Sequence, residues 1–180
     1  MLPHKEFNHK KAALPSNEDI LYARSIQGML APTEEELNDL FQNLAVYDKP
    51  LGFLSGDFLF ARKKKDLTFL AVCDCTGHGM SAALMTVLAR EKLSHAFDKS
   101  IGPAHLLTRL DEKFRRSILR GDKGRLMRAG AGMDLAVIAL NHDRRSLRFA
   151  GARRPLWIVR NGELLEFKGT PRSIGGNYWR

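Results

Sequence analysis

Two aspartates and a glycine-rich turn are the residues best suited to chemistry in this sequence of 180 residues. Asp57 follows Gly56 near the start of one strand-like run, and Asp74 ends a second, apolar run. If the two runs pair as an antiparallel hairpin, their carboxylates converge at one end of it. Carboxylate oxygens are ligands that Mg²⁺ and Mn²⁺ prefer, and such an ion can activate water for attack on phosphorus.

The turn after Asp74 reads Gly77-His78-Gly79 and leads into a predicted helix. Glycines let the backbone approach a ligand closely, and the first N–H groups of a helix attract an anion. Histidine changes charge near neutral pH, so His78 could protonate a leaving oxygen. A purely structural interpretation stays open, because aspartate beside glycine often forms a turn and histidine in such a turn often caps a helix or forms hydrogen bonds.

The elements that must position these residues follow from hydrophobic periodicity and capping signals. Asn17 is expected to cap the first helix, and Thr33 with Glu36 forms a capping-box pattern. Helices are expected over 17–30, 33–44 and 80–97 and from Pro103 onward. Strands are expected over 54–61, 67–74, 134–140, 147–151, 156–159 and 164–168. Two strands, two helices and a meander predict an α+β fold with a mostly antiparallel sheet.

The composition is that of a globular domain, with 44% hydrophobic and 27% charged residues. The longest clean apolar run, 135–140, is too short to cross a bilayer, and no secretory signal precedes it. We therefore expect a soluble cytoplasmic protein with no membrane partner. Cys73 and Cys75 are too close for a disulfide framework and are expected to be buried thiols.

The net charge of +9 permits binding to nucleic acid or to an acidic partner. The segment 109–128 holds eight Lys and Arg residues against three Asp and Glu. A solvated helix face and loop is the preferred interpretation of such a cluster. A basic nucleic-acid-binding module is the weakest hypothesis, because no DNA-reading motif or aromatic platform accompanies the charge.

The surroundings of the two aspartates resemble a known family. Ser-Gly-Asp-Phe at 55–58, followed by Ala-Val-Cys-Asp-Cys-Thr-Gly-His-Gly-Met-Ser-Ala-Ala-Leu-Met at 71–85, is similar to the SpoIIE-type phosphatases. These are a bacterial branch of the PPM family of metal-dependent Ser/Thr protein phosphatases. The likeness covers roughly 17–176 and also includes Tyr22–Gln27, Gly132–Ala136, Phe149–Ala152 and Ser173–Gly176.

The resemblance implies an α-β-β-α sandwich of two packed sheets with a binuclear Mn²⁺ or Mg²⁺ site. By that likeness Asp74 is the bridging ligand, the backbone carbonyl of Cys75 is a further ligand, and Asp57 serves the first metal directly or through water. Asp57, Asp74 and His78 are then the candidate catalytic residues. The implied partner is a phosphoserine or phosphothreonine protein in signal transduction, often an antagonist of an anti-sigma factor.

The sequence also departs from the family pattern. An Asp-Gly motif and a final aspartate lie on later strands of the family domain, and this sequence ends at Arg180 before both. We therefore expect a fold lacking its last strands, at most one well-held ion, and impaired hydrolysis. Residues 1–16 are expected to be a linker or disordered start, and 17–180 a partial phosphatase domain.

The alternative to an impaired enzyme is an inactive remnant that binds phosphoproteins or regulates them. Three further charged residues are expected to have ordinary roles. Asp134 opens a strand near the expected site and is interpreted as a structural carboxylate, and Arg153 and Arg154 as surface arginines.

Overall fold

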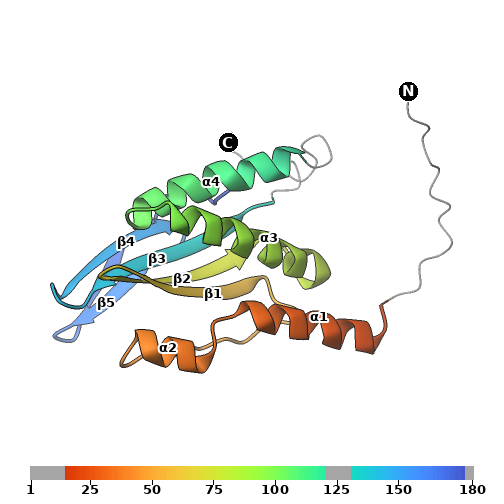
Figure 1. Ribbon diagram of the computed structural model, residues 1–180, viewed down its shortest axis with the longest axis horizontal. Helices are drawn as coiled ribbons and strands as arrows, with labels where there is room; N and C mark the ends of the chain where they lie inside the picture. The colour runs from red at the N-terminus through yellow and green to blue at the C-terminus, as the bar shows by residue number, and fades with distance from the viewer. Residues whose placement is uncertain (1–14, 121–130, 177–180) are drawn as a thin grey trace.

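The computed structural model of the chain describes residues 15–120 and 131–176, and a four-stranded antiparallel sheet lies at its centre (Figure 1). The strand order is β1-β2-β3-β4. The strands are β1 (Asp57–Lys64), β2 (Leu67–Cys75), β3 (Met133–Asn141) and β4 (Ser146–Ala152). A separate hairpin pairs β5 (Leu156–Arg160) with β6 (Glu163–Phe167). The predicted α+β fold with mostly antiparallel sheets is confirmed.

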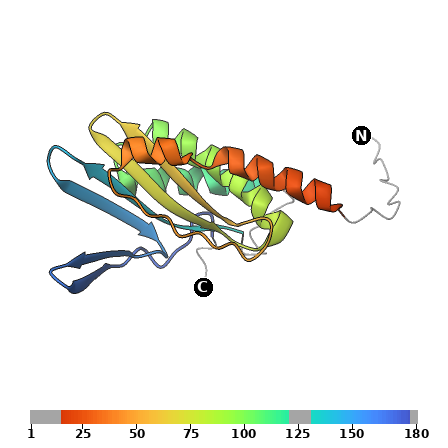
Figure 2. The ribbon, with the colours of Figure 1, turned by 90° about the horizontal axis from the view of Figure 1, so that it is seen from below.

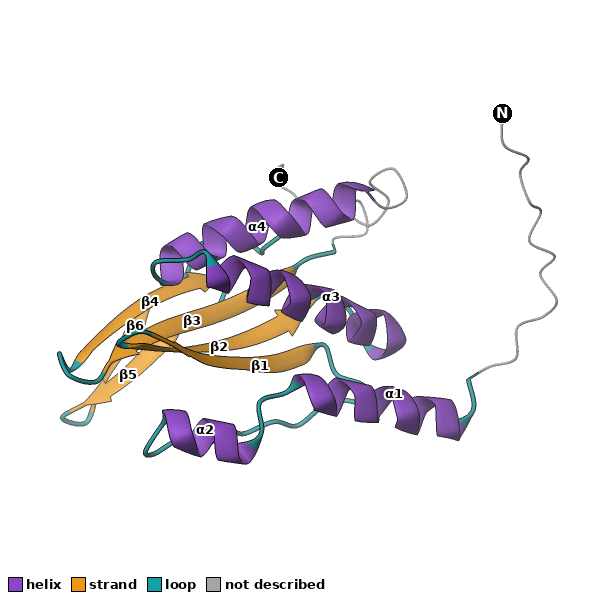
Figure 3. Ribbon diagram, viewed as in Figure 1, coloured by secondary structure: helices purple, strands orange, loops and turns teal. Residues whose placement is uncertain are grey.

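Helices cover one face of the four-stranded sheet. Helix α3 (Gly79–Asp98) and helix α4 (Pro103–Arg120) lie on this face, and the β5–β6 hairpin lies on the other side (Figure 3). Helix α1 (Asn17–Leu30) and helix α2 (Glu34–Leu40) follow the outer β1 edge (Figure 2). Helix α1 contacts α3, and α2 contacts β1, so these N-terminal helices close the edge where Asp57 lies.

The core lies between the sheet and the α3–α4 pair, because alternate residues of β2 and β3 are buried there. The Phe97 ring of α3 meets the rings of Phe60 and Phe69 edge-on, with centroids 5.5 and 5.1 Å apart. Cys73 and Cys75 belong to this core as free thiols, as expected. Burial raises the pKa of both thiols, to about 12 for Cys75, so both stay protonated at neutral pH.

The N-terminal helices differ from expectation in two details. Ser16 and not Asn17 caps α1, in a capping box in which its hydroxyl accepts the Asp19 N–H at 3.1 Å. The second helix has the expected Thr33 capping box but ends at Leu40 instead of residue 44.

The expectations on membrane spans, on the linker and on the basic segment can be compared only with the described residues. No helix in the described ranges combines the length and the apolar character that a bilayer crossing requires. The predicted linker, 1–16, lies outside the described residues except for its last two positions. Residues 121–128 of the basic segment also lie outside them.

Removal of the Phe69 ring tests the core. Phe69 is 1% exposed, and Phe69→Ala should lower the free energy of unfolding by about 3–5 kcal/mol because it leaves a cavity beneath Phe97. Urea denaturation measures the change. Leu147→Ala, at a side chain 39% exposed on β4, is the control and should cost less than about 1 kcal/mol. Equal costs for both variants would contradict this placement of the core.

Candidate active site

Three aspartates lie in one row across the sheet. In the strand register Asp57 is opposite Asp74, and Asp74 is opposite Asp134. The residues on either side of Asp74 and Asp134 along their strands are buried under the helices, so these two aspartates face the opposite side. We call Asp57, Asp74 and Asp134 the aspartate row. The predicted meeting of Asp57 and Asp74 at the end of a β1–β2 hairpin is thus present in the structure.

The environment of Asp57 disfavours the charged form of its carboxyl group. The pKa of Asp57 is raised, first by partial burial, then by the negative charge of Asp74 and by a hydrogen bond to it. Asp48 adds a smaller repulsion, and Arg154 acts in the opposite direction. A proton or a cation between the two carboxylates therefore relieves an unfavourable interaction.

Close backbone packing places Asp57 at this position. The Cys75 N–H donates to the Gly56 carbonyl at 2.9 Å, which joins the start of β1 to the end of β2. A Cβ atom at Gly56 would lie 2.8 Å from the Cys75 carbonyl oxygen, so no larger residue fits without movement. The hydroxyl of Ser55 accepts the Asp57 N–H at 2.9 Å. Asp57 therefore begins its strand in a fixed position relative to Asp74.

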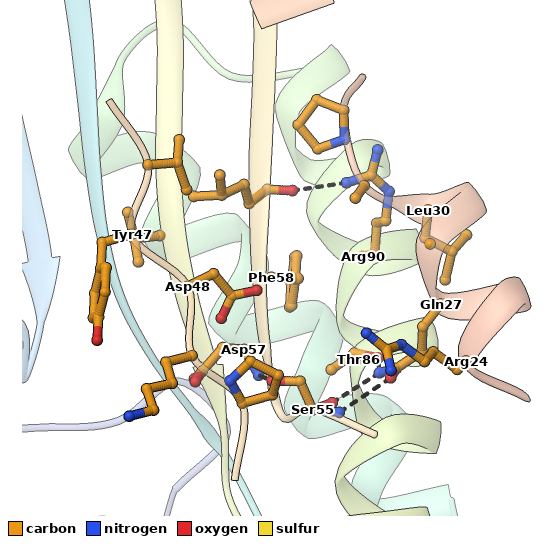
Figure 4. A pocket seen from close by; sticks show the side chains of 18 of the residues that line it. Arg24, Gln27, Leu30, Tyr47, Asp48, Ser55, Asp57, Phe58, Thr86 and Arg90 are labelled. Carbon is orange, nitrogen blue, oxygen red and sulfur yellow. Dashed lines mark hydrogen bonds between the residues drawn. The ribbon is translucent and has the colours of Figure 1, made fainter. Parts of the chain in front are cut away.

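Helix α1 supports the same loop through Gln27 (Figure 4). The Gln27 amide donates to the Ser55 carbonyl at 2.7 Å and accepts the Ser55 N–H at 3.1 Å. It also donates to the Thr86 hydroxyl of α3 at 3.0 Å. One side chain thus joins two helices to the backbone two residues before Asp57.

A cavity of about 540 Å³ opens beside Asp57, between α1, the segment 46–53 and β1 (Figure 4). Its lining includes the charged side chains of Arg24, Asp48 and Arg90 and the ring of Tyr47. The Arg90 guanidinium donates to the Leu59 carbonyl at 2.9 Å, which fixes this wall to β1. The cavity therefore presents cationic, anionic and aromatic groups next to the paired carboxylates.

The two inner aspartates pair with consecutive arginines. The Arg154 guanidinium donates to the Asp74 carboxylate, and the Nε atom of Arg153 lies 3.6 Å from Asp134 Oδ2. The hydroxyl of Ser173 also donates to Asp134. Sequence reasoning expected ordinary surface arginines and a structural Asp134. The arginines are exposed, but all three residues belong to the immediate surroundings of Asp57 and Asp74.

His78 and the glycines form the turn between β2 and α3. His78 is at the N-cap position of α3, and its side chain makes no capping hydrogen bond. Its carbonyl accepts the Ser81 hydroxyl at 3.2 Å. Gly77 and Gly79 have φ angles of +106° and +63°, in the left-handed region that favours glycine. The turn therefore needs glycine for its backbone shape.

The donor set for a metal ion is incomplete among the described residues. No group of three or more His, Cys, Asp or Glu side chains there is arranged to hold an ion. Asp57 and Asp74 converge, whereas Asp134 pairs with Ser173 and Arg153. Two repelling carboxylates are hard oxygen donors of the kind that Mg²⁺ and Mn²⁺ select. Their chemistry fits one such ion, held from this side by two protein carboxylates.

The fold and this site define a class of protein. An antiparallel sheet with two helices on one face and aspartates at adjoining strand ends is the arrangement expected for a PPM-type phosphatase domain. The sequence profile of the stage II sporulation protein E (SpoIIE) family matches residues 64–175, which is more than half of the chain. The chain belongs to the SpoIIE family and has a PPM-type phosphatase fold.

Solved structures support this assignment. The SiaA-PP2C domain of Pseudomonas aeruginosa is 33% identical in sequence and superposes with a TM-score of 0.76. The match covers 88% of this chain and 62% of that chain, so the present chain spans less than two thirds of that domain. A chain from the bacterial stressosome, 19% identical with a TM-score of 0.51, covers 72% of this chain and 59% of its own length and shows likeness of fold alone. No curated protein matches the sequence.

A methyl group at Gly56 tests the close contact between β1 and β2. Gly56→Ala should lower the free energy of unfolding by about 1–3 kcal/mol, since the added atom meets a backbone oxygen that cannot rotate away. Thermal unfolding measures the loss. Gly52→Ala, where a Cβ meets nothing within 4 Å, is the matched control and should change little. A Gly56→Ala protein as stable as the control would show that the contact is not tight.

The raised pKa of Asp57, caused first by partial burial and then by repulsion from Asp74, predicts a pH-dependent gain in stability for Asp57→Asn in the presence of a chelator. A folded-state pKa raised above the unfolded value of 3.8 means that the folded chain binds the proton more tightly. Stability of the wild type therefore falls as pH rises through the raised pKa, and the penalty is full above it. At pH 7 the variant should be more stable by at most about 1 kcal/mol, because water screens this exposed group.

Thermal unfolding at pH 7 and near pH 3.5 measures this effect. The advantage of Asp57→Asn should be smaller at the lower pH, where the aspartate is mostly protonated in both states. Asp66→Asn in the β1–β2 turn is the control and should show no such dependence. A variant that is less stable than the wild type at pH 7 in chelator would exclude repulsion between Asp57 and Asp74.

Proposed function

We propose that this chain hydrolyses phosphoserine or phosphothreonine on a protein in a metal-dependent reaction. The observation that carries the proposal is the convergence of Asp57 and Asp74 at the end of the β1–β2 hairpin in a SpoIIE-family fold. Such a pair is destabilising without a counter-charge, and proteins retain unfavourable charge of this kind mostly at functional sites.

Asp57 and Asp74 are the proposed ligands of one Mn²⁺ or Mg²⁺, with the Cys75 backbone carbonyl as a further oxygen ligand. When bound, a divalent ion supplies an activated water and charge neutralisation for phosphoryl transfer. His78, exposed at the start of α3, is the proposed proton donor to the leaving serine or threonine oxygen. These three side chains and one carbonyl all come from the ends of β1 and β2 and the turn that follows.

The cavity beside Asp57 is the proposed position for residues that flank the phosphorylated side chain. Its volume of about 540 Å³ suits a few peptide side chains, and Arg24 and Arg90 give it positive charge. The proposed substrate is a phosphorylated regulatory protein, such as an antagonist of an anti-sigma factor, in a cytoplasmic signalling system. In the same proposal the phosphatase domain begins at Asn17.

Asp74→Asn tests the central role in this proposal. Release of phosphate from a phosphoserine peptide in Mn²⁺ should fall at least about 100-fold, since several kcal/mol of charge stabilisation depend on this carboxylate. Asp143→Asn, in the exposed β3–β4 turn, removes the same charge away from the site and should retain wild-type turnover. Equal rates for wild type and Asp74→Asn would refute the assignment of Asp74.

The same assay separates hydrolysis from binding alone. The ion pair between Arg154 and Asp74 occupies a carboxylate that a metal needs, and this favours a phosphoprotein-binding module as the second candidate. A folded wild type that binds the phosphopeptide in Mn²⁺ without releasing phosphate would establish that alternative. Circular dichroism on each variant confirms that the compared proteins are folded.

A further inference from the structure

Arg153 and Arg154 each reach a different strand of the aspartate row. Arg154 pairs with Asp74 on β2, and Arg153 pairs with Asp134 on β3. Both arginines come from the single turn that follows β4. Two neighbouring cations are thus directed at two neighbouring carboxylates.

The backbone holds this pair in position. Arg153 has a φ angle of +59°, which is uncommon for a residue with a side chain. Its N–H donates to the Thr170 carbonyl at 2.8 Å, and it forms a parallel bridge to Leu135 of β3. The Thr170 N–H in turn donates to the Gly151 carbonyl at 2.8 Å. The turn is therefore fixed from two sides, independently of the ion pairs that its side chains make.

The ion pair between Arg154 and Asp74 is exposed enough for another cation to replace the arginine. The side chains of Arg154 and Asp74 are 48% and 39% exposed, so water screens their attraction. A divalent ion carries twice the charge of a guanidinium and binds carboxylate oxygens directly. It can therefore take Asp74 from Arg154 without disturbing the core.

Guanidinium groups released from carboxylates, such as those of Arg153 and Arg154, can bind the oxygens of a phosphoryl group. Arginine presents a planar fork of N–H donors that matches phosphate oxygens in bidentate contacts. The segment after β4 holds both guanidinium groups against the aspartate row, where they pair with Asp134 and Asp74. The same arginines can thus pair with carboxylates in one state and with phosphate oxygens in another.

We propose that Arg154 is a placeholder that occupies Asp74 until a divalent ion replaces it, and that Arg154 and Arg153 then bind the phosphoryl oxygens of the substrate. This inference rests on the proposed phosphatase function. It assigns the arginines a role in specificity for phosphorylated ligands, with opposite effects on the binding of metal and of phosphate.

Two binding measurements without turnover test the proposal. Electron paramagnetic resonance of free Mn²⁺ gives the metal dissociation constant, and calorimetry with inorganic phosphate in saturating Mn²⁺ gives the anion dissociation constant. Arg154→Gln should bind Mn²⁺ about two- to fivefold more tightly, because the competing cation is gone. It should bind phosphate about fivefold or more weakly, because a charge-assisted bidentate contact is lost.

Arg160→Gln is the matched control, since it removes the same charge at the β5–β6 turn. It should change each constant less than twofold. Arg154→Lys keeps the charge without the fork, so it should restore competition with Mn²⁺ but only part of the phosphate affinity. Arg153→Gly retains the left-handed backbone. It should weaken the binding of phosphate and have little effect on the binding of Mn²⁺.

Opposite shifts in the two constants distinguish this role from misfolding, which would weaken both. Mn²⁺ affinity that is unchanged or weaker in Arg154→Gln would overturn the placeholder. Tighter binding of Mn²⁺ with unchanged binding of phosphate would overturn the proposal that the released arginines bind the phosphoryl oxygens of the substrate. If Mn²⁺ binds wild type and Asp74→Asn equally, the proposed function fails and this inference fails with it, which is a result distinct from the first two.

Discussion

The register of three antiparallel strands is the constraint on which the site depends. Side chains alternate along a strand, so a slip of one residue between β2 and β3 would turn Asp134 toward the helices. The buried residues on the opposite face prevent that slip, because they must remain beneath α3 and α4. The hydrophobic core on one face thus determines the geometry of charges on the other face.

That geometry concentrates negative charge, and two features of the fold reduce its cost. The side chains of the row keep contact with solvent, so water screens part of the repulsion. Arg153 and Arg154 supply counter-charge from an adjacent turn. The pKa of Asp57 is still raised, first by partial burial and then by the negative charge of Asp74. The stability of the domain therefore comes from the sheet face that α3 and α4 cover. The opposite face can hold the repelling carboxylates of the aspartate row because the core does not depend on them.

Sequence alone predicted the part of this structure that local pattern determines. Periodicity and capping gave the helices and strands to within a few residues, and the β1–β2 hairpin brought Asp57 to Asp74 as expected. Asp134 was not recognised as a member of the row, because β2 and β3 pair across two intervening helices and no local signal gives that register. The roles of Arg153 and Arg154 depend on the same non-local pairing. They also depend on the left-handed backbone of Arg153, which the sequence does not signal because no glycine stands at that position.

Membership of the SpoIIE family settles the fold, whereas in the proposed function activity depends on a competition between a divalent ion and Arg154 for the Asp74 carboxylate. Asp74 lies opposite Asp57 in the β1–β2 hairpin, and its carboxylate accepts a hydrogen bond from Arg154. If a divalent ion wins Asp74, the freed arginine adds to a site for phosphate; if Arg154 keeps it, a cationic surface without a metal remains. Both outcomes favour a phosphorylated ligand, because the positive charge stays at the same place. Under the proposed function, hydrolysis and binding alone therefore differ by the exchange of a single ion pair within one fold.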